Sequence, residues 1–267
     1  MSAHRVTARM FKSRREMFPE LARAMKNPRA AARSRTGRAL LRRMRPRLEG
    51  LKSLPETTYS LYRQYSRNGN RSRFERPFFA KRANLVAAAA VHFLEPDPGL
   101  LDVVQDYIWD TCEETTWILP AHERGGMDLF STETAFCLAE VAHLLRGQLA
   151  AEVVERVEHE IRRRVTDPFL AGAGKRRPAW GLHEPNLTDL FLGRQRHGLG
   201  WYKHHNNWCG VCNGSVGAAL LYCERDPRRL AAGLNLVLEG LEHFLGAAFS
   251  ADGASDEGVS YWQYGLI

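Results

Sequence analysis

Hydrophobic side chains recur at three- and four-residue spacings along most of the chain, which is the period of an amphipathic α-helix. Residues 128–147 show this pattern with apolar positions at Leu129, Phe130, Phe136, Leu138, Val141, Leu144 and Leu145. The same spacing predicts helices over residues 5–26, 37–51, 75–95, 98–114, 149–164, 208–224 and 227–249, and another that begins near Pro55. No segment alternates between apolar and polar residues over the length of a strand, so the sequence predicts an all-α fold.

The predicted helices are separated by short breaks that contain proline or glycine. Segments such as "EPDPG" and "ERDP" lie between one helix and the next, and Gly147 follows the helix of residues 128–147. Helices joined by such short connections pack as antiparallel neighbours, which favours a bundle, a solenoid or a toroid of αα-hairpins. Nearer the N-terminus, "NPRAAARSRTG" contains Pro28 and Gly37 and predicts a break between helices.

A polar segment, "SRNGNRSR" (Ser66 to Arg73), marks the main predicted boundary, between a basic helical N-terminal region of residues 1–72 and a main domain of residues 73–267. Residues 1–85 carry 23 Lys and Arg against five Asp and Glu, whereas the remainder carries 15 against 25. The basic third suits an anionic partner, although a solvated, Arg-rich helical arm also explains it. Because no nucleic-acid-binding motif accompanies the charge, no nucleic-acid partner is expected.

Other patterns exclude several classes of protein. No apolar run reaches the roughly 18 residues of a membrane span, and the N-terminus lacks the apolar stretch of a secretory signal. We therefore expect a cytoplasmic protein without a membrane partner, and a periplasmic one only if the start of the chain is misassigned. Five cysteines, an odd number outside any disulfide-type framework, predict reduced thiols.

Cys209 and Cys212 form a single CxxC, which raises the question of zinc. A structural zinc site needs four ligands, usually two such pairs or a Cys pair with a His pair. His204 and His205 lie nearby, but residues three apart on a helix also simply share one face. We expect the two thiols to pack in the protein interior, and we expect neither a metal nor a cofactor.

Three clusters of polar and aromatic residues lie in loops or at helix starts, where scaffolds usually expose functional side chains. The first is Thr116 to Leu145, with His122 and Asp128, and the second is "HHNNWCGVCNGSVGAALL" (His204 to Leu221), preceded by Trp201 and Tyr202. The third is "DGASDEGVSYWQYG" (Asp252 to Gly265), with Glu257, Tyr261 and Tyr264.

Each cluster also has a purely structural interpretation. His122 and Asp128 could brace the helix that begins at Asp128, and Asn206 or Asn207 could cap the helix that follows. Tyr261 and Tyr264, three residues apart, fit a core stripe as well as a sugar-holding cleft. Sequence alone leaves these alternatives open.

The three clusters resemble, in order, parts of the N-terminal α/α-toroid of the heparinase II/III-like family of polysaccharide lyases. The segments that carry the resemblance are "LPAHERGGMDLFSTETAFCLAEVAHLL", "NNWCGVCNGSVGAALL" and "SADGASDEGVSYWQYG". The resemblance covers roughly residues 75–267 and implies an incomplete α/α-toroid of antiparallel helical hairpins. It does not extend to the basic N-terminal region.

The resemblance also implies β-elimination on a uronate-containing acidic polysaccharide or oligosaccharide. The C5 proton of a uronate is only weakly acidic, so an enzyme must stabilise the charge that develops beside the neighbouring carboxylate. A base then removes the C5 proton and an acid protonates the departing O4. By resemblance, Asn207 neutralises the carboxylate and Tyr261 acts as base or acid, with Tyr264 as the alternative phenol. An unperturbed phenol near pKa 10 needs neighbouring positive charge to act as a base.

The remaining site residues follow from their positions in the three segments. His205, with His204 beside it, is the nearest candidate for a catalytic histidine, since some family members have His directly after the Asn, where this chain has Trp208. The expected substrate-binding residues supply flat rings or polar groups: His204, Trp201, Tyr202, Trp208, Tyr264, Glu257 and His122.

Family members usually continue into a C-terminal β-sandwich that contributes a further histidine to the site. This chain ends at Ile267, which favours a truncated frame or half of a split gene, with a separate β-sandwich chain as partner. Two alternatives remain. One is a non-catalytic toroid fragment that binds glycans or a partner chain. The other is an inverting α/α-toroid glycoside hydrolase with a carboxylate pair such as Asp128 and Glu257, about 6.5–9.5 Å apart.

Overall fold

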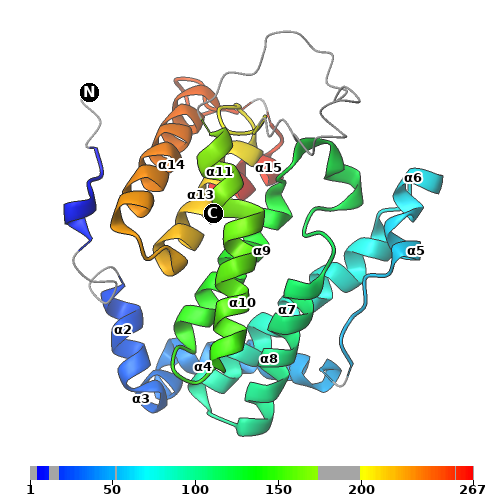
Figure 1. Ribbon diagram of the computed structural model, residues 1–267, viewed down its shortest axis with the longest axis vertical. Coiled ribbons are helices and arrows are strands. Elements are labelled where there is room, and N and C mark those ends of the chain that lie inside the picture. The colour runs from blue at the N-terminus through cyan, green and yellow to red at the C-terminus, as the bar shows by residue number, and fades with distance from the viewer. Residues whose placement is uncertain (1–4, 12–17, 52, 174–198, 256, 267) are drawn as a thin grey trace.

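The computed structural model describes residues 5–11, 18–51, 53–173, 199–255 and 257–266. Within these ranges every regular element is a helix, which confirms the all-α prediction (Figure 1). In chain order they are η1 (Ala8–Met10), α2 (Pro19–Lys26), α3 (Pro28–Arg33), α4 (Arg35–Met44), η2 (Arg45–Gly50), α5 (Tyr59–Tyr62), α6 (Gln64–Asn68), α7 (Ser72–Leu94), α8 (Pro98–Glu113), η3 (Pro120–Gly125), α9 (Leu129–Leu144), α10 (Ala151–Ile161), η4 (Arg162–Thr166), α11 (Asp167–Gly172), α13 (Asn207–Cys223), α14 (Pro227–Ala247) and α15 (Val259–Leu266). Across the described residues, no helix is both long enough and apolar enough to cross a membrane.

Neighbouring helices form the expected hairpins, because α7 packs against α8, α9 against α10 and α13 against α14. In two of these hairpins, the second helix is preceded by an aspartate and begins with a proline. Asp97 caps α8 by accepting a backbone N–H at 3.1 Å, and Asp226 caps α14 at 2.8 Å. Pro98 and Pro227 follow at the first helical positions, where proline loses no intrahelical hydrogen bond. The proline-marked breaks in the sequence therefore begin new helices.

Helix α13 contacts α9, α14 and α15. Small residues let it approach α14 closely: a Cβ added at Gly217 would lie 3.0 Å from the side chain of Val237. The main core is built from apolar side chains of α7 to α10 and α13, such as the fully buried Leu85, Leu138 and Val216. The N-terminus of α13 is thereby fixed relative to α9 and α15.

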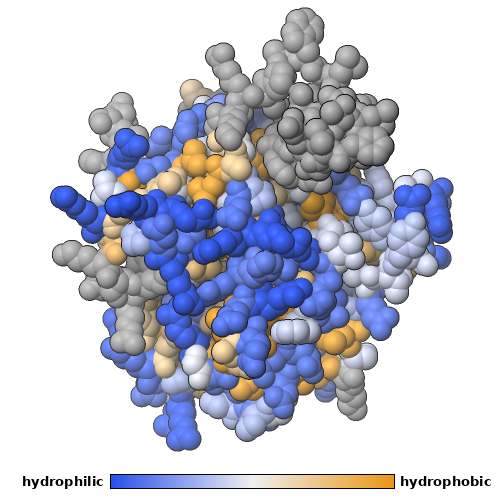
Figure 2. Space-filling model, viewed as in Figure 1, coloured by the Kyte–Doolittle hydropathy of each residue, from blue (hydrophilic) through white to orange (hydrophobic). Residues whose placement is uncertain are grey.

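The basic N-terminal region packs along these helices. Helix α4 and η2 contact α7, and Leu41 belongs to the main core. Val6 and Asn235 of α14 exchange hydrogen bonds at 2.9 and 2.8 Å, and Phe18 stacks on Tyr222 at 4.7 Å. In Figure 1, α2, α3 and α4 lie at the lower left. Figure 2 shows the molecule from the same side, and most of the coloured surface in this view is hydrophilic. The division into two domains at residue 72 stays a prediction.

The predicted break around Pro28 is wrong in part. Pro28 is the first residue of α3, and Asn27 caps this helix by accepting the Ala30 N–H at 3.0 Å. Gly37 lies inside α4, close against the backbone of α3, where a Cβ would collide with Ala31. Within this segment the helices are interrupted at Asn27 and at Ser34, and the proline and glycine lie inside helices, where they begin α3 and pack α4 against it.

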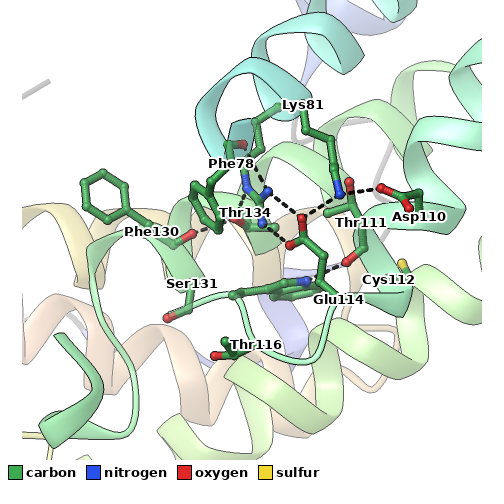
Figure 3. A network of polar contacts seen from close by, with 12 residues as sticks. Phe78, Lys81, Asp110, Thr111, Cys112, Glu114, Thr116, Phe130, Ser131 and Thr134 are labelled. Atoms are coloured by element: carbon green, nitrogen blue, oxygen red, sulfur yellow. Dashed lines mark hydrogen bonds and ion pairs between the residues drawn. The ribbon is translucent and has the colours of Figure 1, made fainter. Parts of the chain in front are cut away.

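A buried ionic network joins α7, α8 and α9. Figure 3 shows the Glu114 carboxylate beside the Lys81 ammonium group, which also pairs with Asp110. The Glu114–Lys81 distance is 2.9 Å, and Arg82 donates to both Glu114 oxygens at 3.1 and 2.6 Å. Arg82 also donates to Thr134 Oγ1 on α9 at 2.9 Å. Since the side chains of Lys81 and Glu114 are only 2% and 5% exposed, this network fixes the three helices where they meet.

Candidate functional site

The first two polar clusters of the sequence meet at the N-terminus of α13. Asn207 and Trp208 begin this helix. The Trp208 ring contacts the imidazole of His122 with centroids 5.0 Å apart, which joins the second cluster to the first. The third cluster joins them through Glu257, whose Oε2 accepts the Asn207 backbone N–H at 2.8 Å. Segments far apart in the sequence therefore share one location.

The start of α13 is capped by a residue that is distant in sequence. Asn206 occupies the N-cap position, but its side chain makes no cap hydrogen bond, and Glu257 takes this role for the N–H of Asn207. The prediction of an Asn206 or Asn207 side-chain cap is therefore wrong. A carboxylate makes a stronger hydrogen bond than an amide and also complements the positive end of the helix dipole. Asn207 is 4% exposed, and a Cβ on Gly265 of α15 would lie 3.1 Å from its Cα.

Asp128 braces the first cluster, which confirms the structural interpretation of this residue. It is fully buried, and its Oδ1 accepts the Ser131 N–H at 2.8 Å to cap α9. Its Oδ2 accepts the Leu119 N–H at 3.2 Å and lies 2.9 Å from Nδ1 of His122. A carboxylate with no exposed surface cannot reach a sugar, so Asp128 does not fit the predicted hydrolase pair.

His122 is oriented by Asp128 and by two aromatic rings. An ionised carboxylate can only accept hydrogen bonds, so Nδ1 of His122 donates to Asp128. In the neutral imidazole, Nε2 is then the nitrogen that accepts a hydrogen bond. The imidazole stacks on Phe130 at 5.8 Å, and Nε2 lies 3.4 Å from a guanidinium nitrogen of Arg71. The side chain is 14% exposed. This geometry suits a hydrogen-bond acceptor or a base held in one orientation.

The two candidate tyrosines lie in different environments on α15. Tyr264 is half-buried and donates its hydroxyl proton to Oε1 of Glu133 at 2.6 Å, whereas Tyr261 is 62% exposed. Burial, and then the hydrogen bond to Glu133, raise the pKa of Tyr264 well above its usual value. Burial also raises the pKa of Glu133, although the bond from Tyr264 opposes this shift. The hydrogen bond to Glu133 therefore fixes the Tyr264 hydroxyl, and the raised pKa keeps this hydroxyl protonated.

The raised pKa of Glu133 predicts a pH dependence of stability. Folding favours the protonated carboxyl, so the folded state binds more protons than the unfolded state above the ordinary pKa of 4.5. The stabilisation is fully present below pH 4.5 and is lost as pH rises through the raised pKa. Urea unfolding of wild type and Glu133→Gln across this range measures it, and the wild type should lose stability relative to the variant as pH rises. Parallel pH profiles would contradict the prediction.

The adjacent His204 and His205 lie directly before the start of α13. Their rings stack with centroids 4.4 Å apart, and His205 is exposed whereas His204 is half-buried. Burial, followed by the charge of His205, lowers the pKa of His204. His204 therefore favours its neutral form, which can accept a proton, more strongly than a free histidine does.

Trp201 and Tyr202 differ from the expectation that their rings face a sugar. Each is 4% exposed, and both pack against Phe169. The Trp201 indole N–H donates to the Met127 carbonyl at 3.0 Å, and the Tyr202 hydroxyl donates to the Leu236 carbonyl at 2.7 Å. With both polar ends satisfied inside the protein, these rings are part of the core. Trp208 is half-buried and keeps a partly accessible surface.

Cys209 and Cys212 are both fully buried, and burial raises the pKa of each thiol. Cys212 belongs to the main core, whereas Cys209 packs against Phe244 and donates to the Tyr202 carbonyl at 3.1 Å. In the described part of the chain, no group of three or more His, Cys, Asp or Glu residues is arranged to hold a metal ion.

We expect Cys209 and Cys212 to react with a thiol reagent only after unfolding, because thiolate formation and reagent access are both suppressed. Labelling followed by mass spectrometry measures this, with half-buried Cys223 as the internal comparison, since burial also raises the pKa of Cys137 to about 12. We also expect no stoichiometric zinc by elemental analysis. Zinc lost on Cys212→Ser would contradict the packing interpretation.

One feature of the site was not predicted from sequence. A cavity of about 320 Å³ lies beside Glu133 and Phe130, between α4 and η2 on one side and α7 and α9 on the other. Arg43 and Arg47 of the basic N-terminal region line it, together with Phe79 of α7. The adjacent Phe78 and Phe79, one turn before Arg82, are the only signal that the sequence offers for such a surface.

No protein-family model matches this chain, and a search of curated proteins gives no match either. The main structural feature of the site is the meeting of the three polar clusters around Asn207, with Trp208, Glu257 and Glu133 as the points of contact.

Proposed function

We propose that the chain is the toroid part of a polysaccharide lyase similar to the heparinase II/III-like family. In this proposal it cleaves a uronate-containing acidic polysaccharide or oligosaccharide by β-elimination. The observation that carries the proposal is the contact of all three resembling segments around Asn207. The resemblance lies in the linear sequence alone, which does not require these segments to touch. The helical hairpins agree with an α/α-toroid, and their closure into an incomplete ring is part of the proposal.

In this proposal Asn207, although only 4% exposed, supplies the amide that stabilises a substrate carboxylate. It lies in the first turn of α13, where the helix dipole favours negative charge. Glu257 holds its backbone N–H and so fixes the position from which the amide side chain projects. In the reaction, an amide N–H of Asn207 donates to the uronate carboxylate as negative charge spreads onto it from C5.

Two proton transfers complete the elimination. A base removes the C5 proton, the C–H electrons form the C4=C5 double bond, and O4 leaves after receiving a proton. His204, which favours its neutral form, and the exposed His205 supply candidates for the base. The phenols differ in suitability: the exposed Tyr261 is the one that a ligand can reach most easily, whereas the hydroxyl of Tyr264 is already bonded to Glu133 and its raised pKa makes it the weaker proton donor.

The test is to incubate the protein with alginate, heparin-like and other uronate polymers. β-Elimination creates an unsaturated uronate that absorbs ultraviolet light, whereas hydrolysis creates reducing ends without that absorbance. Absorbance that rises with reducing ends supports the proposal. Reducing ends alone would indicate a hydrolase, and binding without either signal would favour the non-catalytic alternative.

A further inference from the structure

The cavity beside Glu133 has one wall from the basic N-terminal region and two from the main helices. Arg43, Met44 and Arg47 come from α4 and η2, Phe79 and Val86 are among the α7 residues, and α9 contributes its own wall. Its volume of about 320 Å³ lies at the small end of the roughly 300–1,000 Å³ typical of ligand sites. It therefore suits one small ring or one residue of a longer chain.

The arginines in and near this cavity differ in their partners. Arg82 is held by Glu114 deep in the protein, and neighbouring Arg45 pairs with Glu95 on the surface. Arg43 and Arg47 are exposed and form no ion pair with any acidic residue that the structure describes. Guanidinium groups in this state retain all their donors for an incoming anion, and carboxylates match their geometry.

The opposite side of the cavity offers flat apolar surface. Phe79 and Val86 are each 39% exposed, although large apolar side chains are usually buried. Phe130 lies edge-on to Phe79, with ring centroids 4.9 Å apart, so the two rings form a corner. An apolar, aromatic lining with a few convergent polar groups is the common composition of a small-molecule site.

Two residues connect the cavity to the candidate site. Phe130 lines the cavity and also stacks on His122, which contacts Trp208 at the start of α13. Glu133 lines the cavity and accepts the hydroxyl of Tyr264. Phe130 and Glu133 therefore contact both the cavity and residues around Asn207.

We propose that this cavity binds one uronate residue of an acidic oligosaccharide, with Arg43 and Arg47 at its carboxylate and the Phe79 and Phe130 rings against its flat face. The identity of the sugar rests on the proposed function, whereas the need for one anionic group beside an apolar face comes from the cavity itself. The basic N-terminal region then forms one side of the substrate-binding surface.

The experiment measures binding of a short oligogalacturonate by calorimetry, with product absorbance recorded in the same sample. The Arg43→Ala/Arg47→Ala variant should lose roughly 10- to 100-fold in affinity, the range for hydrogen bonds to a charged group. Arg38→Ala/Arg42→Ala is the charge-matched control, because both residues are exposed on α4 but line a different groove. Its affinity should stay within about twofold of wild type.

A methyl-esterified oligogalacturonate and the Phe79→Ala variant separate the two contacts. The neutral ester should bind wild type and Arg43→Ala/Arg47→Ala equally, and Phe79→Ala should weaken binding of both sugars. Equal losses for Arg38→Ala/Arg42→Ala and Arg43→Ala/Arg47→Ala would indicate general attraction to a polyanion and overturn the proposal. So would wild type that binds no oligouronate. Arginine-dependent binding without product would support the cavity assignment while contradicting lyase activity on this oligogalacturonate.

Discussion

Replacing Glu114 by alanine is expected to lower the free energy of unfolding by about 3–5 kcal/mol, the range for a buried ion pair that loses one partner. Glu114 holds Lys81 at 2.9 Å and both oxygens engage Arg82. Without Glu114, the Lys81 ammonium keeps only Asp110 among these partners, and Arg82 loses its carboxylate. Two positive charges would then face each other in a nearly dry environment, where solvent cannot screen them.

The neighbouring Glu113 provides the control. It is the same residue type in the preceding position and pairs with Arg156, but its side chain is 51% exposed. Glu113→Ala should change the free energy of unfolding by less than about 1 kcal/mol, because solvent screens exposed pairs. Urea unfolding followed by circular dichroism measures both variants. Similar small losses at the two positions would show that the buried network contributes little to stability.

Much of the fold could be predicted from sequence because helix periodicity and helix-start residues are local signals. Pro98 after Asp97 and Pro227 after Asp226 begin helices as their types predict. The segment around Pro28 was misread because the same residues mark a helix start and a break, and only the packing of Gly37 against Ala31 distinguishes them. Local rules located the helices here but did not determine how closely they approach each other.

The site was predictable as a set of segments but not as a set of contacts. Polar crowding ahead of α13 identified the right region, yet the capping group is Glu257, 50 residues away. No local rule reaches that far. Trp201 and Tyr202 carry polar groups that suit a ligand-facing ring or a core ring equally, and only their bonds to Met127 and Leu236 show that they are core.

Glu133, in contrast, is not identifiable as a site residue from the sequence. It lies within an otherwise mostly apolar helix, where a charged position would be taken for the solvent-facing side. In the structure it is half-buried and accepts the hydroxyl of Tyr264, which comes from the far end of the chain. The partner that gives Glu133 its importance cannot be inferred from the helix in which it lies.

If the protein is active on a uronate polymer, Asn207→Ala should lower kcat by about 10²–10³, the usual effect of removing one preorganised donor to developing negative charge. Asn207 lies at the start of α13, where Glu257 fixes its backbone and Gly265 packs against it. Because the donor is needed most in the transition state, KM should change much less than kcat. Initial rates of unsaturated-product formation across substrate concentrations give the two constants separately.

Asn206→Ala is the matched control for this test. Asn206 is the same residue type, one position earlier, and its side chain makes no cap bond to α13. Its substitution should leave kcat within a few-fold of wild type, and equal melting temperatures would exclude unfolding as the cause of any difference. Tyr261→Phe and Tyr264→Phe then identify the acid, because only the phenol that protonates O4 should reproduce a loss as large as that of Asn207→Ala. If Asn207→Ala retains the wild-type kcat, Asn207 does not stabilise the carboxylate, whichever tyrosine proves to matter.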